Sequence, residues 1–208
     1  MGIKPFVATA IACAAASGAA WPTALNWMPV ADILRDREVV LMHSVAGTAA
    51  EFGGDGTHSG SFLVGLGDRL EIGFDSDYKR GYSLNAKLLL YEEPTEGRYA
   101  VSAGVLNFAG NEFDEYVVAR YDFPGFRLHA GWMYDTDSRL LVGADFPILG
   151  DWSAMVEHAS GEDGYTYLGI YGYVKGVEGL SFGASVGLPN DDDNEVVYNG
   201  YVMLSFRL

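Results

Sequence analysis

The sequence has one cysteine, few positive charges and no long apolar stretch after its first twenty residues. The cysteine is Cys13, so a chain cleaved beyond it lacks disulfides, cysteine-ligated zinc and a thiol nucleophile. Thirteen lysines and arginines stand against 28 acidic residues, and the net charge of −15 argues against nucleic-acid binding, which needs a basic surface. Transmembrane helices need roughly 18 consecutive apolar residues, and the sequence predicts none after residue 20.

Residues 1–20 have the features of a signal peptide. Lys4 supplies a positive charge, residues 6–16 form an apolar run too short to span a bilayer as a helix, and small residues follow. We expect export with cleavage at residues 19–20; a buried core helix is the alternative. Lipid attachment at Cys13 is a second alternative, although the surrounding "AIAC" begins with alanine where a lipid-attachment motif has leucine.

The rest of the chain alternates between apolar and polar residues with the period of two that is typical of β-strands. In "FRLHAGWMYDTDSRLLVGADF" (residues 126–146), two alternating runs flank an Asp-rich break, which predicts a hairpin. Twelve runs are expected, at residues 38–46, 60–67, 69–76, 82–91, 98–107, 113–122, 126–135, 139–147, 151–159, 164–174, 179–188 and 196–208. Their spacing suits tilted membrane strands of roughly 9–11 residues. The predicted fold is all-β, a single antiparallel up-and-down transmembrane β-barrel of about 12 strands over residues 38–208 with short periplasmic turns.

The connections between these runs alternate in character. Those after odd-numbered strands hold most of the acidic residues, and residues 191–193 are the extreme case. Those after even-numbered strands include tight turns with Gly or Pro, as short periplasmic turns do. This alternation supports an even number of strands with both barrel ends of the chain on the periplasmic side.

One face of the strands is apolar and the other is polar, and alternation alone does not say which face is inside. A soluble lipocalin-like barrel buries the apolar face, whereas a membrane barrel turns it to lipid. The polar face is rich in Gly and Ser, which suits a lumen. Aromatic residues near strand ends are typical of interfacial girdles: Tyr82, Tyr99, Trp132, Tyr134, Trp152 and Tyr201. We therefore expect a lipid-facing apolar surface and keep a secreted lipocalin-like binding protein as the alternative.

The last strand, "YVMLSFRL", alternates through Val202, Leu204, Phe206 and Leu208. It is similar to the assembly signal of outer-membrane barrels, although Leu208 stands where an aromatic residue is usual. Two strands are undecided. In "YTYLGIYGYV" both faces are apolar, and in "EVVLMHSVAG" His43 falls on the lipid face, where we expect it near the rim.

The charged residues of the polar face are the candidate lumen residues: Glu71, Lys87, Arg120, Arg127, His129, Asp145 and Glu157. Two interpretations stay open, a pore lining that selects small solutes and a network of mutually neutralising pairs that makes the barrel rigid. Gly and Ser on the strand before the last leave space in the lumen, while Met133, Leu141 and Met155 fill it. Residues 21–37 are not strand-like, and we expect them to form an N-terminal periplasmic segment or a plug.

The sequence carries no catalytic motif of the GxSxG, HExxH or phosphate-loop kind. His58, His129 and His158 have no diagnostic spacing, and residues 191–193 lack the spacing and the glycine of an EF-hand. The sequence therefore predicts no enzyme, no cofactor and no metal site. Divalent ions that bridge the acidic loops to lipopolysaccharide phosphates are a weaker hypothesis.

Residues 83–132 resemble the YjbH-like outer-membrane proteins in the order of their features: a Lys-bearing strand, an acidic turn, an "AxG" strand and an "EYxVAS" strand. The matching residues are Lys87, Glu92, Ala103, Gly104, Asn107, Gly110, Glu115, Tyr116, Val118 and Ala119. Arg120 and Tyr121 replace the small residue and the lysine of that pattern. The resemblance implies a barrel associated with exopolysaccharide production, without a defined activity.

The predicted function is a porin-like passive channel for small solutes or a structural envelope protein, with polysaccharide export as a refinement. The expected location is the outer membrane. The expected partners are outer-membrane lipid, lipopolysaccharide and the barrel-assembly machinery, with small polar solutes or polysaccharide as cargo.

Overall fold

The computed structural model describes residues 24–51, 56–78, 81–108 and 114–208. These residues form twelve strands: β1 (Glu38–Thr48), β2 (Thr57–Leu66), β3 (Leu70–Ser76), β4 (Tyr82–Glu92), β5 (Tyr99–Leu106), β6 (Asp114–Phe123), β7 (Phe126–Tyr134), β8 (Ser138–Leu149), β9 (Trp152–Ala159), β10 (Tyr165–Tyr173), β11 (Leu180–Pro189) and β12 (Val197–Arg207). One 3₁₀ turn, η1 (Gly67–Arg69), lies between β2 and β3. The signal peptide expected at residues 1–20, with Cys13, lies outside the described residues. Across the described ranges, no helix is long and apolar enough to span a bilayer.

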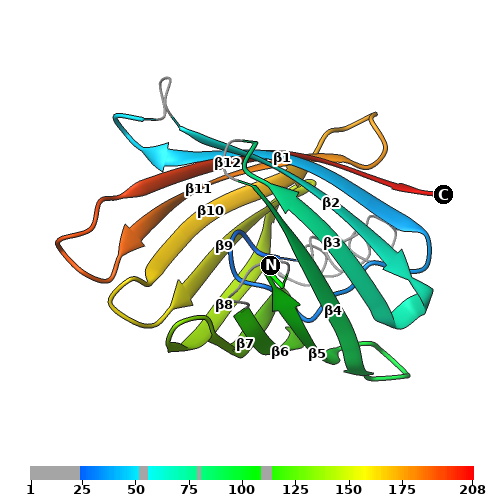
Figure 1. Ribbon diagram of the computed structural model, residues 1–208. Coiled ribbons are helices and arrows are strands. Elements are labelled where there is room, and N and C mark those ends of the chain that lie inside the picture. The colour runs from blue at the N-terminus through cyan, green and yellow to red at the C-terminus, as the bar shows by residue number, and fades with distance from the viewer. Residues whose placement is uncertain (1–23, 52–55, 79–80, 109–113) are drawn as a thin grey trace, which may run out of the picture.

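The strands form a closed barrel in which each one pairs antiparallel with the strands before and after it (Figure 1). The ring closes where β1 pairs with β12, from Glu38 opposite Arg207 to Thr48 opposite Val197. Closure removes the sheet edges, so the backbone donors and acceptors of the strands are satisfied within the ring. The predicted all-β up-and-down barrel of twelve strands is confirmed.

The two ends of the barrel differ in their connections. At the turn end, where β1 begins, the strands are joined by residues 67–69, 93–98, 124–125, 150–151 and 174–179. At the loop end they are joined by residues 49–56, 77–81, 107–113, 135–137, 160–164 and 190–196. The two shortest turns, residues 124–125 and 150–151, each contain a glycine with positive φ, Gly125 at +99° and Gly150 at +57°. This conformation favours glycine because glycine has no Cβ.

The apolar face of the strands points outward. Leu128, Leu140 and Phe182 expose 40%, 57% and 37% of their surface, which is the reverse of a soluble barrel with an apolar interior. Aromatic rings stack on this outer face near strand ends, with centroids 6.2 Å apart for Trp132 and Tyr134. An outward apolar surface of this extent needs a cover, and lipid supplies one.

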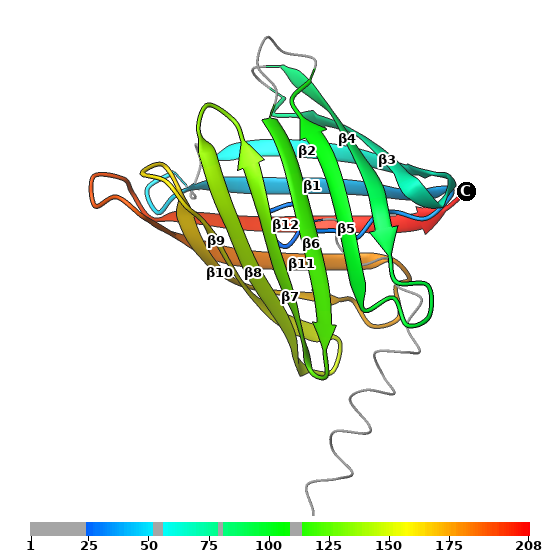
Figure 2. The ribbon, with the colours of Figure 1, turned by 90° about the horizontal axis from the view of Figure 1, so that it is seen from below.

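Residues 24–36, here called the inner segment, run inside the ring of strands (Figures 1 and 2). At its start the N–H of Leu25 donates to the carbonyl of Met28 at 3.1 Å, which closes a turn. At the turn end it leaves the lumen beside Gly65, whose carbonyl accepts the N–H of Arg37 at 3.0 Å just before β1 begins. Its apolar side chains fill the interior, because Leu25, Met28, Val30, Ala31 and Leu34 are each at most 1% exposed.

Candidate functional site in the barrel lumen

The charged residues expected in the lumen all face the interior, and none of them exposes more than 9% of its surface. They are Glu71 on β3, Lys87 on β4, Arg120 on β6, Arg127 and His129 on β7, Asp145 on β8 and Glu157 on β9. Charges buried to this degree are stable only when they are paired and hydrogen-bonded. Their partners lie partly on the barrel wall and partly on the inner segment.

Glu157 binds the start of the inner segment through its backbone. Its carboxylate accepts hydrogen bonds from three successive N–H groups, those of Asn26 at 3.1 Å, Trp27 at 2.8 Å and Met28 at 3.1 Å. Successive N–H groups that converge on one anion form a concave anion site, and such charge-assisted bonds are about twice as strong as neutral ones. The carboxylate therefore fixes the turn at the start of the segment.

A second group of contacts follows the middle of the inner segment. Lys87 Nζ lies 3.5 Å from Glu71 Oε1 and donates to the carbonyl of Val30 at 3.4 Å. Glu71 Oε2 accepts the N–H of Leu34 at 3.0 Å. This ion pair of the wall thus also satisfies one donor and one acceptor of a non-helical, buried backbone.

Asp32 connects the inner segment to two arginines of the wall. Its Oδ1 pairs with Arg120 Nη1, and its Oδ2 lies 3.0 Å from Arg127 Nη1. Arg120 Nε also lies 3.1 Å from Asp122 Oδ1. Two guanidinium groups on neighbouring strands therefore share one carboxylate that the barrel itself does not supply.

Asp145 orients the second of these arginines. Its carboxylate accepts bonds from Arg127 Nε at 3.1 Å and from Arg127 Nη2 at 2.9 Å. His129 Nε2 lies 2.8 Å from Asp145 Oδ1, and the hydroxyl of Tyr171 donates to Oδ2 at 2.8 Å. Because one edge of the guanidinium is held on the wall, the remaining Nη1 points to Asp32.

Several contact residues were not among the candidates from the sequence. Asn26 Oδ1 accepts bonds from Ser185 Oγ at 2.8 Å and Asn199 Nδ2 at 2.6 Å, and Ser102 Oγ donates to the carbonyl of Ala31 at 2.7 Å. Ser185, Asn199 and Ser102 all lie on the polar face, and the same alternation that found the charged residues could have found them. No comparable signal marks Asn26 and Asp32.

Two glycines of the wall make room for the inner segment. A Cβ on Gly143 would lie 2.5 Å from Leu25 Cδ1 and 3.2 Å from Met28 Sδ. A Cβ on Gly65 would overlap the backbone carbonyl oxygen of Arg35 in the inner segment and lie 2.6 Å from the carbonyl oxygen of Leu34. Glycine at these positions allows the backbones to approach closely.

Inward-facing tyrosines fill the lumen beside β10 and β11. In β10 Tyr167 and Tyr171 face inward while Leu168 and Ile170 are exposed outside, which resolves the strand that the sequence left undecided. The placement of Tyr201 in the outer girdle is wrong, because it faces inward opposite Gly183, where a Cβ would lie 2.5 Å from Tyr201 Cζ.

The space expected in the lumen beside β11 is filled as well. The ring of Tyr167 lies against Gly187, and that of Tyr201 lies against Gly183. Met133, Leu141 and Met155 are buried in the lumen as expected. The glycines of this wall therefore accept neighbouring side chains and do not line an open channel.

His43 lies on the outer face of β1. It pairs in register with Gly60 of β2, which pairs with Ser76, the last residue of β3. Its ring stacks on those of His58 and Tyr78 with centroids 5.5 Å and 5.9 Å away. This level is the rim of the apolar band on β3, where the sequence led us to expect His43.

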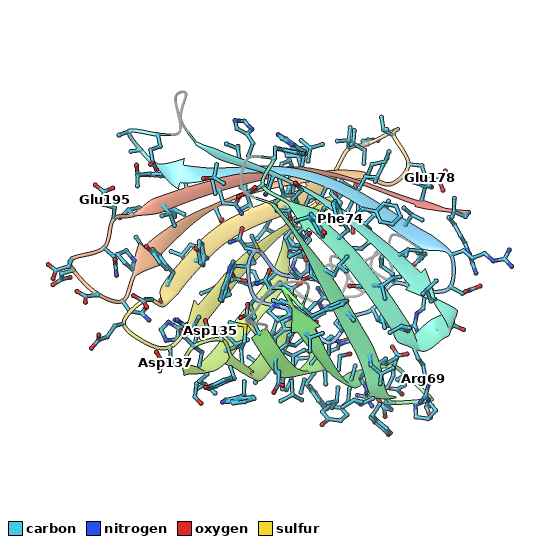
Figure 3. All side chains as sticks on the ribbon, in the orientation of Figure 1. Arg69, Phe74, Asp135, Asp137, Glu178 and Glu195 are labelled. Atoms are coloured by element: carbon cyan, nitrogen blue, oxygen red, sulfur yellow. The ribbon has the colours of Figure 1, made fainter. Side chains whose placement is uncertain are left out.

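The loop end is strongly acidic. Figure 3 shows Asp135, Asp137 and Glu195 at this end and Arg69 and Glu178 at the other. Burial alone would raise the pKa of Asp135, but hydrogen bonds from the N–H of Asp137 and the guanidinium of Arg139 outweigh it and lower that pKa from its usual value. Asp135 is therefore firmly ionised beside the mouth of the barrel.

The histidines considered for catalysis lie on three different strands with different partners. His58 Nδ1 is 3.4 Å from His43 Nε2, His129 contacts Asp145, and His158 Nδ1 is 2.9 Å from Thr166 Oγ1. Within the described residues, no three His, Cys, Asp or Glu side chains are grouped so that they could hold a metal ion. Acidic residues 191–193 lie in the exposed connection before β12.

Comparison with known proteins supports the fold. No protein-family model matches the chain, and no curated protein matches its sequence. Among solved structures, a KdgM porin matches with a TM-score of 0.55 at 11% identity, covering 82% of this chain and 99% of that one. A NanC porin matches with a TM-score of 0.52 at 12% identity, covering 82% and 100%. An outer membrane channel from Pseudomonas putida F1 matches with a TM-score of 0.51 at 12% identity, covering 85% and 98%.

The chain has the fold of an outer-membrane porin. With its apolar face outside and its charges inside, the lipocalin-like alternative is not favoured. The porin-like barrel of this chain differs from an open tube in one respect, which is that its own residues 24–36 are packed along the lumen.

Proposed function

We propose that the protein is a porin-like barrel of the outer membrane whose lumen is plugged by its inner segment. The observation that carries the proposal is the complete burial of Leu25, Met28, Val30 and Leu34 inside the ring. A water-filled path beside these side chains would leave part of their surface exposed. Small polar solutes therefore pass only after the inner segment has been displaced.

The outer surface supports the membrane location. Phe62, Ile72 and Phe74, near the middle of β2 and β3, expose 40–42% of their surface, although they are large apolar side chains. Lipid removes such surface from water at about 25 cal/mol per Å². Outer-membrane lipid and lipopolysaccharide are therefore proposed as the immediate surroundings of the barrel.

Planar-bilayer conductance tests the plug. The double variant Asp32→Asn/Glu157→Gln removes both carboxylate anchors of the inner segment while keeping the shapes of the side chains. The matched control, Glu162→Gln/Asp163→Asn, makes the same chemical changes at the exposed loop end. We expect rare openings in the native chain and the control, and frequent openings in the anchor variant.

If the Asp32→Asn/Glu157→Gln variant folds but never conducts, the plugged-channel proposal is wrong. Heat-modifiable migration on a gel shows whether the barrel is folded in that case. The second function, a structural envelope protein, would then remain, and the filled lumen is the observation that favours it.

A link to polysaccharide export is the finer proposal. It is supported by the resemblance of residues 83–132 to the YjbH-like proteins, and by hydroxyl, amide and tyrosine side chains on the lumen wall. A KdgM porin of the same fold has been solved in complex with disordered oligogalacturonate, with a TM-score of 0.56 at 12% identity. The amount of secreted polysaccharide in a deletion strain, with and without the native chain, tests this link.

Export by a cleaved signal peptide and insertion by the barrel-assembly machinery are also proposed. The outward apolar alternation of β12 supports the second proposal, since Val202, Leu204 and Phe206 are all exposed. N-terminal sequencing of the mature barrel tests cleavage at residues 19–20. The insertion yield of Phe206→Ser, against Tyr198→Ser on the same face, tests the role of β12.

A further inference from the structure

Two arginines on neighbouring strands point at the same place in the lumen. Arg120 on β6 and Arg127 on β7 direct their Nη1 atoms at the two different oxygens of Asp32. Asp32 belongs to the inner segment, so its removal leaves two convergent guanidinium donors on the wall, with the carboxylates of Asp122 and Asp145 beside them. Paired guanidinium donors match the geometry of a carboxylate better than that of a single-atom anion.

Both arginines are held on the wall by contacts that do not involve the inner segment. Asp145 accepts hydrogen bonds from Nε and Nη2 of Arg127, and it is itself hydrogen-bonded to His129 and Tyr171. Arg120 Nη2 donates a hydrogen bond to the carbonyl of Gly97, and Arg120 Nε lies 3.1 Å from Asp122 Oδ1 as an ion pair without a hydrogen bond. The two Nη1 donors therefore keep their directions when Asp32 is absent.

While the inner segment is in place, the site is also shielded from water. Arg120, Arg127 and Asp145 are at most 9% exposed, and His129 is fully buried. Charge-assisted bonds gain strength in such surroundings because the local dielectric is low.

We propose that Arg120 and Arg127 form a binding site for small carboxylates, which Asp32 fills from within the same chain. A soluble carboxylate binds there when Asp32 is removed or when the inner segment leaves the lumen. The inference rests on the proposed function for access in the native protein, because only displacement of the plug exposes the site. Binding to a chain without Asp32 does not depend on conduction.

Calorimetric titration of the detergent-solubilised full chain with sodium acetate tests the site, with sodium chloride at equal ionic strength as the reference. We expect saturable acetate binding to Asp32→Ala and no binding to the native chain, in which Asp32 occupies the site. The double variant Asp32→Ala/Arg127→Met should bind acetate at least about tenfold more weakly. Sodium sulfate titrated in parallel shows whether the site selects carboxylates.

Equal heats for acetate and chloride on a folded Asp32→Ala barrel would overturn the proposal, and so would unchanged acetate binding in the double variant. Tighter binding of sulfate than of acetate would overturn the carboxylate class. If Asp32→Ala does not fold, Asp32→Ser is titrated instead, since it keeps a polar side chain without a carboxylate.

Conductance of the same variants separates this inference from the proposed function. Acetate binding without current in any variant would leave the site standing and remove the channel. Current in Asp32→Ala without acetate binding would leave the channel standing and remove the site.

Discussion

The carboxylate of Glu157 on β9 binds the backbone N–H of Trp27, 130 positions earlier in the chain, with an Oε1–N distance of 2.8 Å. The N–H groups of Asn26 and Met28 flank this bond and donate to the same carboxylate. One side chain of the wall thus replaces the solvent for three donors that no regular secondary structure satisfies. This contact makes the start of the inner segment a specific element of the fold.

Replacing Glu157 with Gln should loosen the start of the inner segment. The amide keeps the shape but loses the charge, and bonds to a charged acceptor contribute about 1.5–3 kcal/mol. The amides of residues 26–28 should therefore exchange hydrogen roughly 10- to 100-fold faster. Hydrogen exchange read by mass spectrometry measures this, with Glu162→Gln as the control. Unchanged protection in residues 26–28 would show that Glu157 does not anchor the segment.

Gly65→Ala should displace the inner segment where it leaves the lumen. The added Cβ overlaps the backbone carbonyl of Arg35, which cannot rotate away as a side chain can. The control is Gly73→Ala on the neighbouring strand, where a Cβ meets Leu63 and Asn85 at ordinary distances of 3.4 Å and 3.5 Å. We expect more frequent channel openings in the Gly65 variant, and equal conductance of the two variants would contradict this.

Removal of Arg127 should destabilise the barrel much more than removal of Arg35. Arg127→Met leaves the buried carboxylates of Asp32 and Asp145 short of a partner, and breaking such a buried pair costs about 3–5 kcal/mol. Arg35 pairs with Glu92 at 3.0 Å on the surface, and Arg35→Met should cost less than about 1 kcal/mol. Urea unfolding in detergent, followed by tryptophan fluorescence, compares the two, and similar losses would refute the buried network.

An arginine on the outer face should be costly in proportion to its depth in the membrane. Val142 lies mid-strand on β8 and faces outward, so Val142→Arg should reduce the free energy of unfolding by about 2–4 kcal/mol in lipid bilayers. Tyr134 lies at the end of β7, and Tyr134→Arg should cost only about 0–1 kcal/mol. Equal costs at both positions would argue against a lipid-facing band.

Much of the barrel wall follows from alternation alone. The period of two assigns Glu71, Lys87 and Glu157 to the polar face, because successive side chains of a strand point to opposite faces, and all three are buried in the structure. Tyr201 was misplaced because its aromatic character was taken as evidence for the girdle, although Val202 and Leu204 beside it already fixed the parity. In β10 the tyrosines are nearly as apolar as Leu168 and Ile170, so the sequence of this strand does not show which face points inward. Only its pairing with the neighbouring strands decides that.

The position of the inner segment could not be predicted in the same way. Residues 24–36 have no repeat, and their place is fixed by hydrogen bonds with eight strands that are distant in the sequence. In the sequence Asp32 resembles an ordinary surface acid, and only the fold places Arg120 and Arg127 next to it. The pairing of the lumen charges likewise depends on which strands are neighbours, and composition does not contain that information.

The seam between β1 and β12 is continuous from Glu38 to Thr48, and this restricts how residues 24–36 travel. A hydrogen-bonded wall offers them no sideways exit, and their bond to β1 ties them to the turn end. They can withdraw only along the barrel axis. Folding of the barrel is restricted in the same way. Either β1 and β12 pair last, around an inner segment that is already in place, or the inner segment enters along the axis after the barrel has closed.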